Sequence, residues 1–418
     1  MKEAYIPRKL ESTILRYLKS PEIIAVVGPR QSGKTTMLLH IFEKLKSQAI
    51  FLSFEDKKIL NLFIYETEEF IELYIKPYKY TFIDEFQYAK KGGKILKYII
   101  DSTKAKIIIS GSSNIELTVQ AVKYLVGRIF VFSLFPLDFA EFLAFNEPHL
   151  FALYQKHKFF LKKSIQKPLP DLSFLVMAQV KKYYNQYIIF GGYPRVVLSQ
   201  TDEEKKTVLK NIYNTYFLRE VKDLLGLMDD YKLTQMIKAL ALQIGGLVQY
   251  REIGNMSELS FQSVKHYLNF LEKTFICFLV KPYFRNKRTE IVKNPKIYFF
   301  DTGLRNYVVD DFRKIGDRTD SGALLENSLA MQLAKQEIVF KFWRNKQHSE
   351  IDFVLDLPES KKLAIEVKKS LKNSDFTSKS VRNFQSEYKD IPLIFCAYEQ
   401  KNEKIKAGAI ETAFIEMI

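Results

Sequence analysis

The sequence predicts an α/β protein with three parts: a parallel-sheet domain at the N-terminus, a mostly helical middle segment and a small α/β domain at the C-terminus. Residues 1–145 alternate apolar strand-like runs with helical segments, which is the pattern of βαβ units. Residues 175–280 carry apolar side chains at helical spacing, and short strand-like runs return after residue 285. This organisation suits a chain of 418 residues, which has room for several domains.

The N-terminal elements follow the βαβ order. Helices are expected at 35–46 and 93–101, between apolar runs that fit buried strands. Strands joined by such helices run parallel, and their sheet is covered on both faces. The expected strands are 23–27, 49–54, 80–83 and 106–110.

A glycine-rich loop follows the first expected strand and opens a helix. The run Gly28-Pro-Arg-Gln-Ser-Gly33-Lys34-Thr35 fits G-x-x-x-x-G-K-[ST] without a mismatch. In such a loop backbone N–H groups surround a phosphate, the lysine neutralises the β- and γ-phosphates, and the threonine hydroxyl binds Mg²⁺. ATP and Mg²⁺ are therefore the predicted cofactors. The predicted nucleotide-binding residues are Gly28, Pro29, Arg30, Gln31, Ser32, Gly33, Lys34, Thr35, Thr36 and Ser110.

Two adjacent carboxylates, Asp84 and Glu85, end the third expected strand. In a P-loop fold the first carboxylate holds Mg²⁺ and the second polarises the attacking water. We therefore predict Asp84 and Thr35 as Mg²⁺ ligands and Glu85 as the catalytic base. With a base in place, the site is predicted to hydrolyse ATP as well as bind it.

Two polar positions further along extend the predicted site. Ser110 ends the fourth strand and is predicted to contact the γ-phosphate or the water, with Ser112 and Asn114 as alternatives. Arg128 follows Gly127 at the end of a helical stretch. An arginine there can stabilise transition-state charge in cis or across a subunit interface, or can be an ordinary surface residue.

The composition limits the class of protein. The net charge is +16, which suits attraction to a phosphate backbone, although the same excess of lysine can simply solvate the surface. No apolar run approaches the roughly 18 residues of a membrane span, and no secretory signal is evident. Cys277 and Cys396 lie in apolar runs as expected for buried thiols, so we predict a cytoplasmic protein without membrane partners.

Residues 232–278 predict a helix-turn-helix. Apolar residues recur at helical spacing from Leu233 to Ile244, and Gly245-Gly246 ends the first helix. A short segment from Arg251 follows, and Ser260 is placed to cap the last helix. Such a helix either reads DNA or packs within a protein-binding module. Its buried stripe is expected to be Val264, Leu268 and Leu271, and its outward residues Gln262, Ser263, Lys265 and His266.

Carboxylates gather in the C-terminal part. Helix 322–335 carries Glu326, and strict alternation in the strand 349–355 places Glu350 and Asp352 opposite Ile351, Phe353 and Leu355. The next strand places Glu366 and Lys368 on one face. If the two strands pair as a hairpin, Asp352, Glu366 and Lys368 converge. Two carboxylates holding Mg²⁺ beside a lysine can direct water at a phosphodiester, so Asp352 and Glu366 are predicted metal ligands and all three residues are predicted catalytic.

These residues together resemble the prokaryotic AAA+-type P-loop ATPases that carry a C-terminal domain of unknown function. The resemblance covers nearly the whole chain except 149–167, and it also rests on Gly191-Gly-Tyr-Pro-Arg195, Tyr298-Phe-Phe-Asp301-Thr-Gly-Leu304 and Ala364-Ile-Glu366-Val-Lys368. It implies an ATPase domain (1–145), a helical lid or linker (146–229), a winged-helix-like domain (230–310) and a PD-(D/E)xK nuclease-like domain (311–418) in which Glu326 is the helix acid.

Two functions remain open at this level. One is an ATPase whose nucleotide state controls a C-terminal module directed at nucleic acid, with DNA cleavage as one form of that action. The other is a nucleotide-controlled switch whose nuclease-like domain binds protein and cleaves nothing. The expected partners are ATP, DNA, and a protein partner or further copies of the chain.

Overall fold

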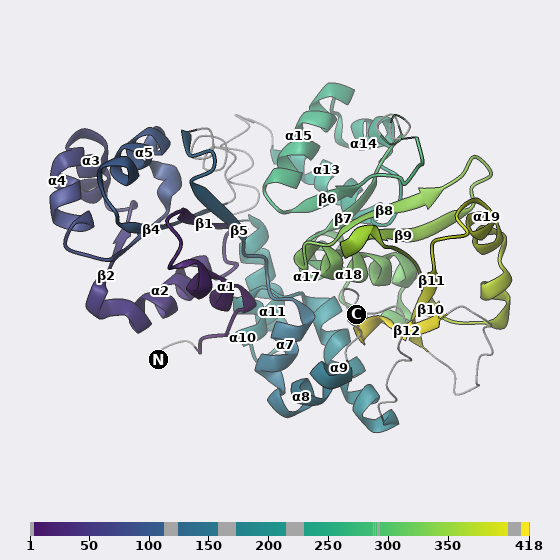
Figure 1. The fold of residues 1–418 in the computed structure, drawn as a ribbon. Helices are drawn as coiled ribbons and strands as arrows, with labels where there is room; N and C mark the ends of the chain where they lie inside the picture. The colour runs from purple at the N-terminus through teal and green to yellow at the C-terminus, as the bar shows by residue number, and fades with distance from the viewer. Residues whose placement is uncertain are drawn as a thin grey trace. The chain divides into compact units, whose positions relative to one another are not determined.

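A computed structural model describes residues 4–112, 124–157, 173–214, 230–286, 288, 290, 293–399 and 411–417 (Figure 1). Asn114 and residues 158–167 of the unmatched stretch lie outside the described residues. The chain forms two compact units: unit 1 comprises 1–137, 193–198 and 273–276, and unit 2 comprises 138–192, 199–272 and 277–418. The division into four domains stays a prediction.

Unit 1 contains a five-stranded sheet in the order β2-β3-β4-β1-β5, in which every neighbouring pair is parallel. The α/β class predicted from the alternating pattern is confirmed. β4 lies between β1 and β3, so strands that are far apart in the sequence are neighbours at the centre. The strands are β1 Ile23–Gly28, β2 Ala49–Ser53, β3 Tyr80–Asp84, β4 Lys106–Ser112 and β5 Ile129–Ser133.

Helices cover both faces of this sheet. Ile24 and Val26 of β1 share a core with residues of α1 and α2, whereas Ala25 and Val27 share a core with residues of α3, α4 and α5. Alternate side chains of one strand therefore enter two cores, as strands buried on both faces require. The helices and short turns of unit 1 are α1 Lys9–Tyr17, α2 Lys34–Leu45, η1 Lys46–Gln48, α3 Lys57–Tyr65, α4 Thr67–Phe70, η2 Ile71–Ile75, η3 Phe86–Tyr88, α5 Gly92–Ser102 and α10 Pro194–Leu198.

Unit 2 begins with helices, as the apolar spacing predicted. Three of them, α13, α14 and α15, are followed by the antiparallel pair β6 Cys277–Val280 and β7 Lys296–Phe299. The segment from Arg251 belongs to the full helix α14. The helices and turns that lie wholly or mainly in unit 2 are α7 Phe139–Asn146, α8 Pro148–His157, α9 Phe174–Phe190, α11 Asp202–Asn211, α13 Asp230–Leu242, α14 Tyr250–Ser257, α15 Phe261–Lys273, α17 Thr302–Val309, η6 Ile315–Asp317, α18 Ser321–Lys335, η7 Pro358–Ser360, η8 Asn373–Thr377, α19 Lys379–Glu387 and η9 Ile415–Met417.

A second five-stranded sheet lies in unit 2, in the order β12-β11-β10-β9-β8. It is mixed: β8, β9 and β10 are antiparallel, and β10, β11 and β12 are parallel. The predicted pairing of the two carboxylate-bearing strands is confirmed, because β9 and β10 are hydrogen-bonded neighbours. The strands are β8 Val339–Arg344, β9 Glu350–Asp356, β10 Lys362–Ser370, β11 Leu393–Glu399 and β12 Glu411–Phe414.

The strict alternation predicted for β9 is wrong. A register shift interrupts its pairing with β8 between Lys341 and Trp343. Ile351 and Val354, three positions apart, consequently share one core cluster, while Phe353 packs on the ring of Tyr298 with centroids 6.0 Å apart. An extra residue in one strand of an antiparallel pair changes the phase of the side chains beyond it.

No helix in the described part of the chain is long and apolar enough to cross a membrane.

Candidate functional site

The phosphate loop joins β1 to α2 and depends on glycine at both ends. Gly28 has φ +155°, and a Cβ there would lie 2.2 Å from the carbonyl oxygen of Leu134. Gly33 has φ +92°, a conformation that residues with a side chain rarely adopt. The glycines therefore make the turn possible and bring the loop against the strand edge, which leaves the N-terminus of α2 facing the loop.

Polar groups inside the loop are suited to an anionic ligand. The Lys34 ammonium donates to the carbonyl oxygens of Gly28 and Pro29, both at 2.9 Å, and Lys34 is 6% exposed. The Ser32 hydroxyl is fully buried and has no hydrogen-bond partner among the described residues. A buried donor without a partner is costly, and a bound phosphate would satisfy it.

Two of the predicted residues, Thr35 and Ser110, contact a third, Asp84. The Thr35 hydroxyl donates to Asp84 Oδ2 at 2.7 Å, and the Ser110 hydroxyl donates to Asp84 Oδ1. Ser110 reaches this carboxylate because β4 lies next to β3. A hydroxyl and a carboxylate in contact at the end of a phosphate loop are the oxygen ligands that Mg²⁺ takes in such folds. The side chains of Thr35 and Asp84 therefore fit the predicted ion.

Glu85 sits just beyond the strand in a left-handed conformation, with φ +54°. Burial raises the pKa of its carboxyl group, and the charge of Asp84 raises it further, while a hydrogen bond from the Gln87 amide lowers it. A carboxyl group with a raised pKa is a stronger base than an ordinary surface glutamate. Neither Gln87 nor this backbone turn was predicted from the sequence.

Arg8 is a second contributor that the sequence analysis missed. Its guanidinium donates to the carbonyl oxygens of Ser32 at 2.8 Å and Phe135 at 2.6 Å, and the residue is 8% exposed. It thereby links the phosphate loop to the segment after β5. No motif marks it, because its partners are backbone atoms of distant segments.

The structure does not bring Arg128 to the phosphate loop. Its carbonyl accepts from Ile23 N at 2.9 Å, so it lies at the start of β1, and its guanidinium pairs with Asp101. Gly28 ends the same strand, about 17 Å away at 3.3 Å per residue. This position gives no support to the predicted role of Arg128 in cis. A role across a subunit interface stays a prediction.

Two motifs of the family resemblance meet at Asp301. Its carboxylate accepts from Gly192 N at 2.7 Å and from Leu304 N at 2.9 Å, which caps α17. A Cβ at Gly191 would lie 2.0 Å from Asp301 Oδ1, so the close approach requires glycine. The chain then enters unit 1, where Pro194 Cγ lies 3.6 Å from where a Cβ of Gly33 would stand.

The carboxylates predicted in the C-terminal part gather in unit 2. Asp352 Oδ2 accepts from Val367 N at 2.8 Å, and Lys368 Nζ lies 2.7 Å from Glu366 Oε1. Burial and the charge of Asp352 raise the pKa of Glu326 to about 7 and that of Glu366 to about 8. Glu326, Asp352, Glu366 and Lys368 are thus brought together as predicted.

A lysine that the sequence analysis did not single out occupies the centre of this cluster. The ammonium of Lys296 lies 2.8 Å from Glu326 Oε1, 2.5 Å from Glu350 Oε1 and 3.8 Å from Asp352 Oδ1. The side chain of Lys296 is 1% exposed. Burial alone would lower its pKa, but the charges of Glu326, Asp352 and Glu350 raise the pKa above its ordinary value. The ammonium therefore stays charged.

The position of Lys296 affects whether a metal ion could bind at the predicted ligands Asp352 and Glu366. Within the described ranges no group of three or more His, Cys, Asp or Glu side chains could hold a metal ion. The ammonium already supplies positive charge to Glu326, Glu350 and Asp352, so the residues do not fit a metal ion here. Metal binding by Asp352 and Glu366 stays a prediction. Glu366 Oε2 remains buried without a hydrogen-bond partner in the described part of the chain.

The last helix of the middle segment has the predicted faces. The Ser260 hydroxyl accepts from Ser263 N at 3.1 Å and caps α15. Val264, Leu268 and Leu271 are buried, whereas Gln262, Lys265 and His266 are exposed. The exposed face carries Lys265, which lies 4.5 Å from the ring centre of Phe261.

The parallel sheet, the phosphate loop and the Asp84 contacts define a P-loop ATPase-like fold in unit 1. Residues 20–143 match the family described as AAA domain. Residues 181–319 match a domain of unknown function (DUF8612), and residues 321–413 match another (DUF4143).

Whole-chain relatives exist in distant organisms. An uncharacterized protein of Methanocaldococcus jannaschii, MJ1544, is 26% identical over 89% of this chain and 80% of its own length. An uncharacterized protein of Haemophilus influenzae is 26% identical over 96% of both chains.

Solved structures resemble the chain only loosely. The Aeropyrum pernix ORC1 protein, solved in complex with DNA, has a TM-score of 0.31 at 12% identity and covers 74% of this chain and 94% of its own. AMPPCP-bound DnaA from Aquifex aeolicus has a TM-score of 0.26 at 12% identity and covers 63% of this chain and 86% of its own. Similarity of this degree says nothing about the ligands of this chain.

Proposed function

We propose that unit 1 binds ATP with Mg²⁺ and hydrolyses it. The observation that carries the proposal is the contact of Thr35 and Ser110 with Asp84, at the mouth of a loop that holds Lys34 and the unpartnered Ser32 hydroxyl. Lys34 would turn from the loop carbonyls to the phosphates, and Thr35 and Asp84 would hold the ion. Mg²⁺ neutralises charge on the phosphate oxygens when it is bound. Glu85 would accept a proton from the attacking water.

Replacing Lys34 tests the nucleotide site. Lys34→Ala removes the cation that faces the phosphates, so Mg-ATP affinity should fall on the order of a hundredfold, as for loss of charged hydrogen bonds. A titration with a fluorescent ATP analogue measures this. Lys46→Ala is the matched control, because Lys46 lies at the other end of α2 in an exposed pair with Glu43. Equal affinity in the parent and Lys34→Ala would refute the assignment.

We further propose that nucleotide state is passed to unit 2 through the segment 191–198. Gly191 and Gly192 hold Asp301 in unit 2, and Pro194 lies beside Gly33 in unit 1. A phosphate bound at Gly33 would act on a segment that is covalently continuous with the Asp301 contact. This supports an ATPase that controls its C-terminal half.

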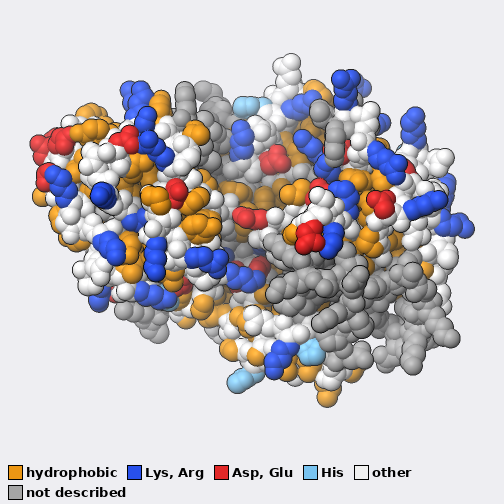
Figure 2. All heavy atoms as spheres, viewed as in Figure 1, with side chains coloured by type: hydrophobic (Ala, Val, Ile, Leu, Met, Phe, Trp, Pro, Cys, Tyr) orange, Lys and Arg blue, Asp and Glu red, His pale blue; other side chains and the backbone are white. Residues whose placement is uncertain are grey.

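Nucleic acid is the proposed target of that half. The net charge is +16, and Figure 2 shows Lys and Arg side chains scattered over the visible face without one dominant patch. Three helices followed by an antiparallel pair, with the exposed α15 face, support a winged-helix-like reader of DNA.

Salt dependence tests this proposal. The affinity for duplex DNA should fall as salt rises, with a slope in log–log form of about −0.9 for each phosphate neutralised. Fluorescence anisotropy across a salt series gives the slope, and Lys265→Ala should reduce it. If no complex forms at low salt, the C-terminal half serves protein partners instead.

DNA cleavage is a second candidate, favoured by the gathering of Asp352, Glu366 and Lys368. The Lys296 ammonium argues against cleavage, because it already pairs with Asp352 and would compete with a metal ion for that carboxylate. We therefore expect the parent protein not to nick plasmid DNA with Mg²⁺ or Mn²⁺. Cleavage by the parent that disappears in both Asp352→Ala and Glu366→Ala would overturn this expectation and establish a nuclease.

A further inference from the structure

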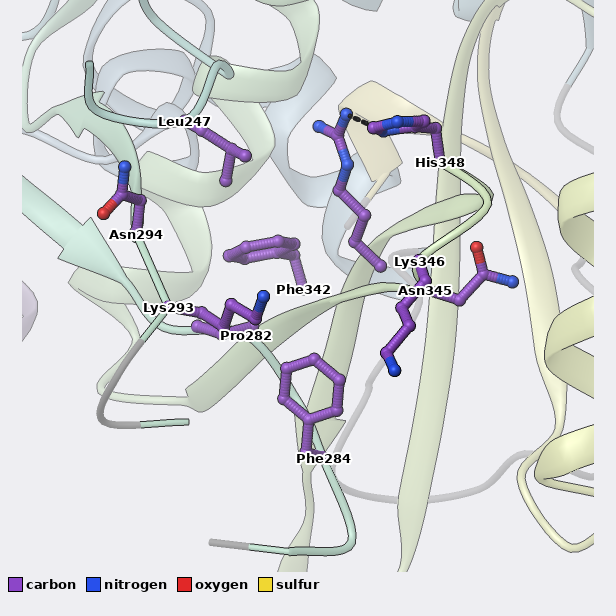
Figure 3. Close-up of a pocket in the computed structure, with 10 residues that line it drawn as sticks. Leu247, Pro282, Phe284, Lys293, Asn294, Phe342, Asn345, Lys346 and His348 are labelled. Carbon is purple, nitrogen blue, oxygen red and sulfur yellow. Dashed lines mark hydrogen bonds between the residues drawn. The ribbon is translucent and has the colours of Figure 1, made fainter. Parts of the chain in front are cut away.

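A cavity of about 400 Å³ opens in unit 2 beside the β8–β9 turn (Figure 3). This volume lies within the range of about 300–1,000 Å³ typical of small-ligand pockets. Three backbone segments frame it: Leu247, Pro282 to Phe284, and Lys293 to Asn294. Their positions are fixed by pairing, since Leu247 bridges to Lys296 and Pro282 bridges to Phe342 of β8.

The floor of the cavity is aromatic. Figure 3 shows the Phe342 ring between Leu247 and Phe284, with Pro282 beside it. Phe342 is 1% exposed, so it supports the floor from below, whereas Phe284 is partly exposed and presents its ring to the cavity. Aromatic rings that line an open cavity offer flat faces on which a nucleobase can stack.

The rim of the cavity is cationic. Lys293 and Lys346 are exposed and stand on opposite sides of the aromatic floor in Figure 3. His348 accepts from the Arg344 guanidinium at 2.9 Å if Nδ1 is unprotonated, so these two side chains form a pair at the upper edge. The described lining includes no Asp or Glu. The cavity therefore combines an apolar floor with cations at its rim, which is the chemistry that recognises a base and its phosphates.

We propose that this cavity binds a nucleotide of a single-stranded nucleic acid, with the base stacked on Phe284 and the phosphates on Lys293 and Lys346. The proposal rests on the proposed action of the C-terminal half on nucleic acid and names where a strand is held. A single strand is favoured over a duplex because only an unpaired base can leave its stack and enter a cavity.

The charge of the carboxylate cluster around Lys296 affects whether an anionic strand can bind at the cavity. The Lys296 ammonium lies 5.4 Å from the centre of the Phe342 ring, and Arg344 Nη1 lies 3.2 Å from Glu350 Oε2. Unneutralised, Glu326, Glu350 and Asp352 would repel an approaching phosphate. Lys296 and Arg344 offset most of that charge, so the repulsion of an anionic strand beside the cluster is reduced.

Binding of labelled oligothymidylate to the full chain tests the proposal. A strand of about 12 nucleotides lies within the usual site size of single-strand binders. The double variant Lys293→Ala/Lys346→Ala should reduce the slope of log affinity against log salt by about 1.4, at roughly 0.7 for each phosphate contact. Phe284→Ala should weaken binding about tenfold by removing a stacking surface. Inorganic polyphosphate should compete poorly, because it has no bases.

Lys210→Ala is the matched control, since Lys210 is exposed on α11 of the same unit and does not line the cavity. It should leave affinity and salt slope unchanged. Failure of the parent to bind the strand, an equal loss in Lys210→Ala, or equal competition by polyphosphate would overturn the proposal. If Lys265→Ala weakens duplex binding while the cavity variants change nothing, the cavity assignment fails and the action on nucleic acid stands. ATP turnover, measured in parallel, should be the same in all these variants.

Discussion

Glu85→Gln should bind Mg-ATP as tightly as the parent and lose turnover by about 10²–10⁴-fold, the usual contribution of a general base. Glu85 follows β3 and lies outside the phosphate loop, and it is proposed to act on water and not to hold the ion, so binding should survive the change. Glutamine keeps the shape and the contact with Gln87 but cannot accept the proton from water. Steady-state phosphate release and fluorescent-nucleotide titration, measured on one preparation, separate turnover from binding.

Glu55→Gln is the matched control, since Glu55 follows the neighbouring strand β2 and is exposed. The Glu55→Gln variant should hydrolyse ATP at the rate of the parent protein. The raised pKa of Glu85 adds a second readout: activity should fall as pH falls through that pKa, because only the carboxylate accepts a proton. In Gln87→Ala this acid limb should move to higher pH, because the hydrogen bond that lowers the pKa is lost. Parental turnover in Glu85→Gln would place the base elsewhere.

Lys296→Met should lower the free energy of unfolding by about 3–5 kcal/mol at neutral pH, the cost of leaving buried charge unpaired. The substitution keeps the volume of the side chain but removes the ammonium from three carboxylates. Lys341→Met is the matched control: Lys341 pairs with the single carboxylate of Glu290 at 2.5 Å, so its loss should be smaller. Urea unfolding of the two variants and the parent gives the difference. Equal losses of unfolding free energy in the two variants would show that Lys296 stabilises the fold no more than Lys341 does.

The loss in Lys296→Met should depend on pH. Glu326 and Glu366 have folded-state pKa values of about 7 and about 8, above the ordinary 4.5, so the folded chain binds protons more tightly than the unfolded chain. Their contribution to stability is therefore present at low pH and is lost as pH rises toward 8. Without Lys296 the pKa of Glu326 rises further. The loss of unfolding free energy in Lys296→Met should therefore be largest above pH 8 and become smaller as the pH falls. If the loss of unfolding free energy in Lys296→Met does not change with pH, it comes from lost side-chain packing and not from lost charge.

Much of the candidate nucleotide site was predictable because its residues fall in two short contiguous segments of the chain. The loop from Gly28 to Thr35 and the pair Asp84-Glu85 each follow an apolar strand, and strand ends of a parallel sheet meet at one edge. The elements of unit 1 were predictable for the same local reason, since alternating strands and helices bury both faces of one sheet. The polar face of α15 followed from spacing within a single helix.

Contacts between distant segments could be known only from the tertiary structure. Strand order decides that Ser110 touches Asp84 and that Arg128 lies at the far edge of the sheet, and no local pattern encodes that order. Lys296 enters the carboxylate cluster from another sheet. The helices α17 and α18 and the strand β8 separate it in the chain from Asp352. The sequence determined which side chains could do chemistry, because motif and periodicity are local. Packing decided which of them are neutralised, because burial of charge depends on every segment that folds against it.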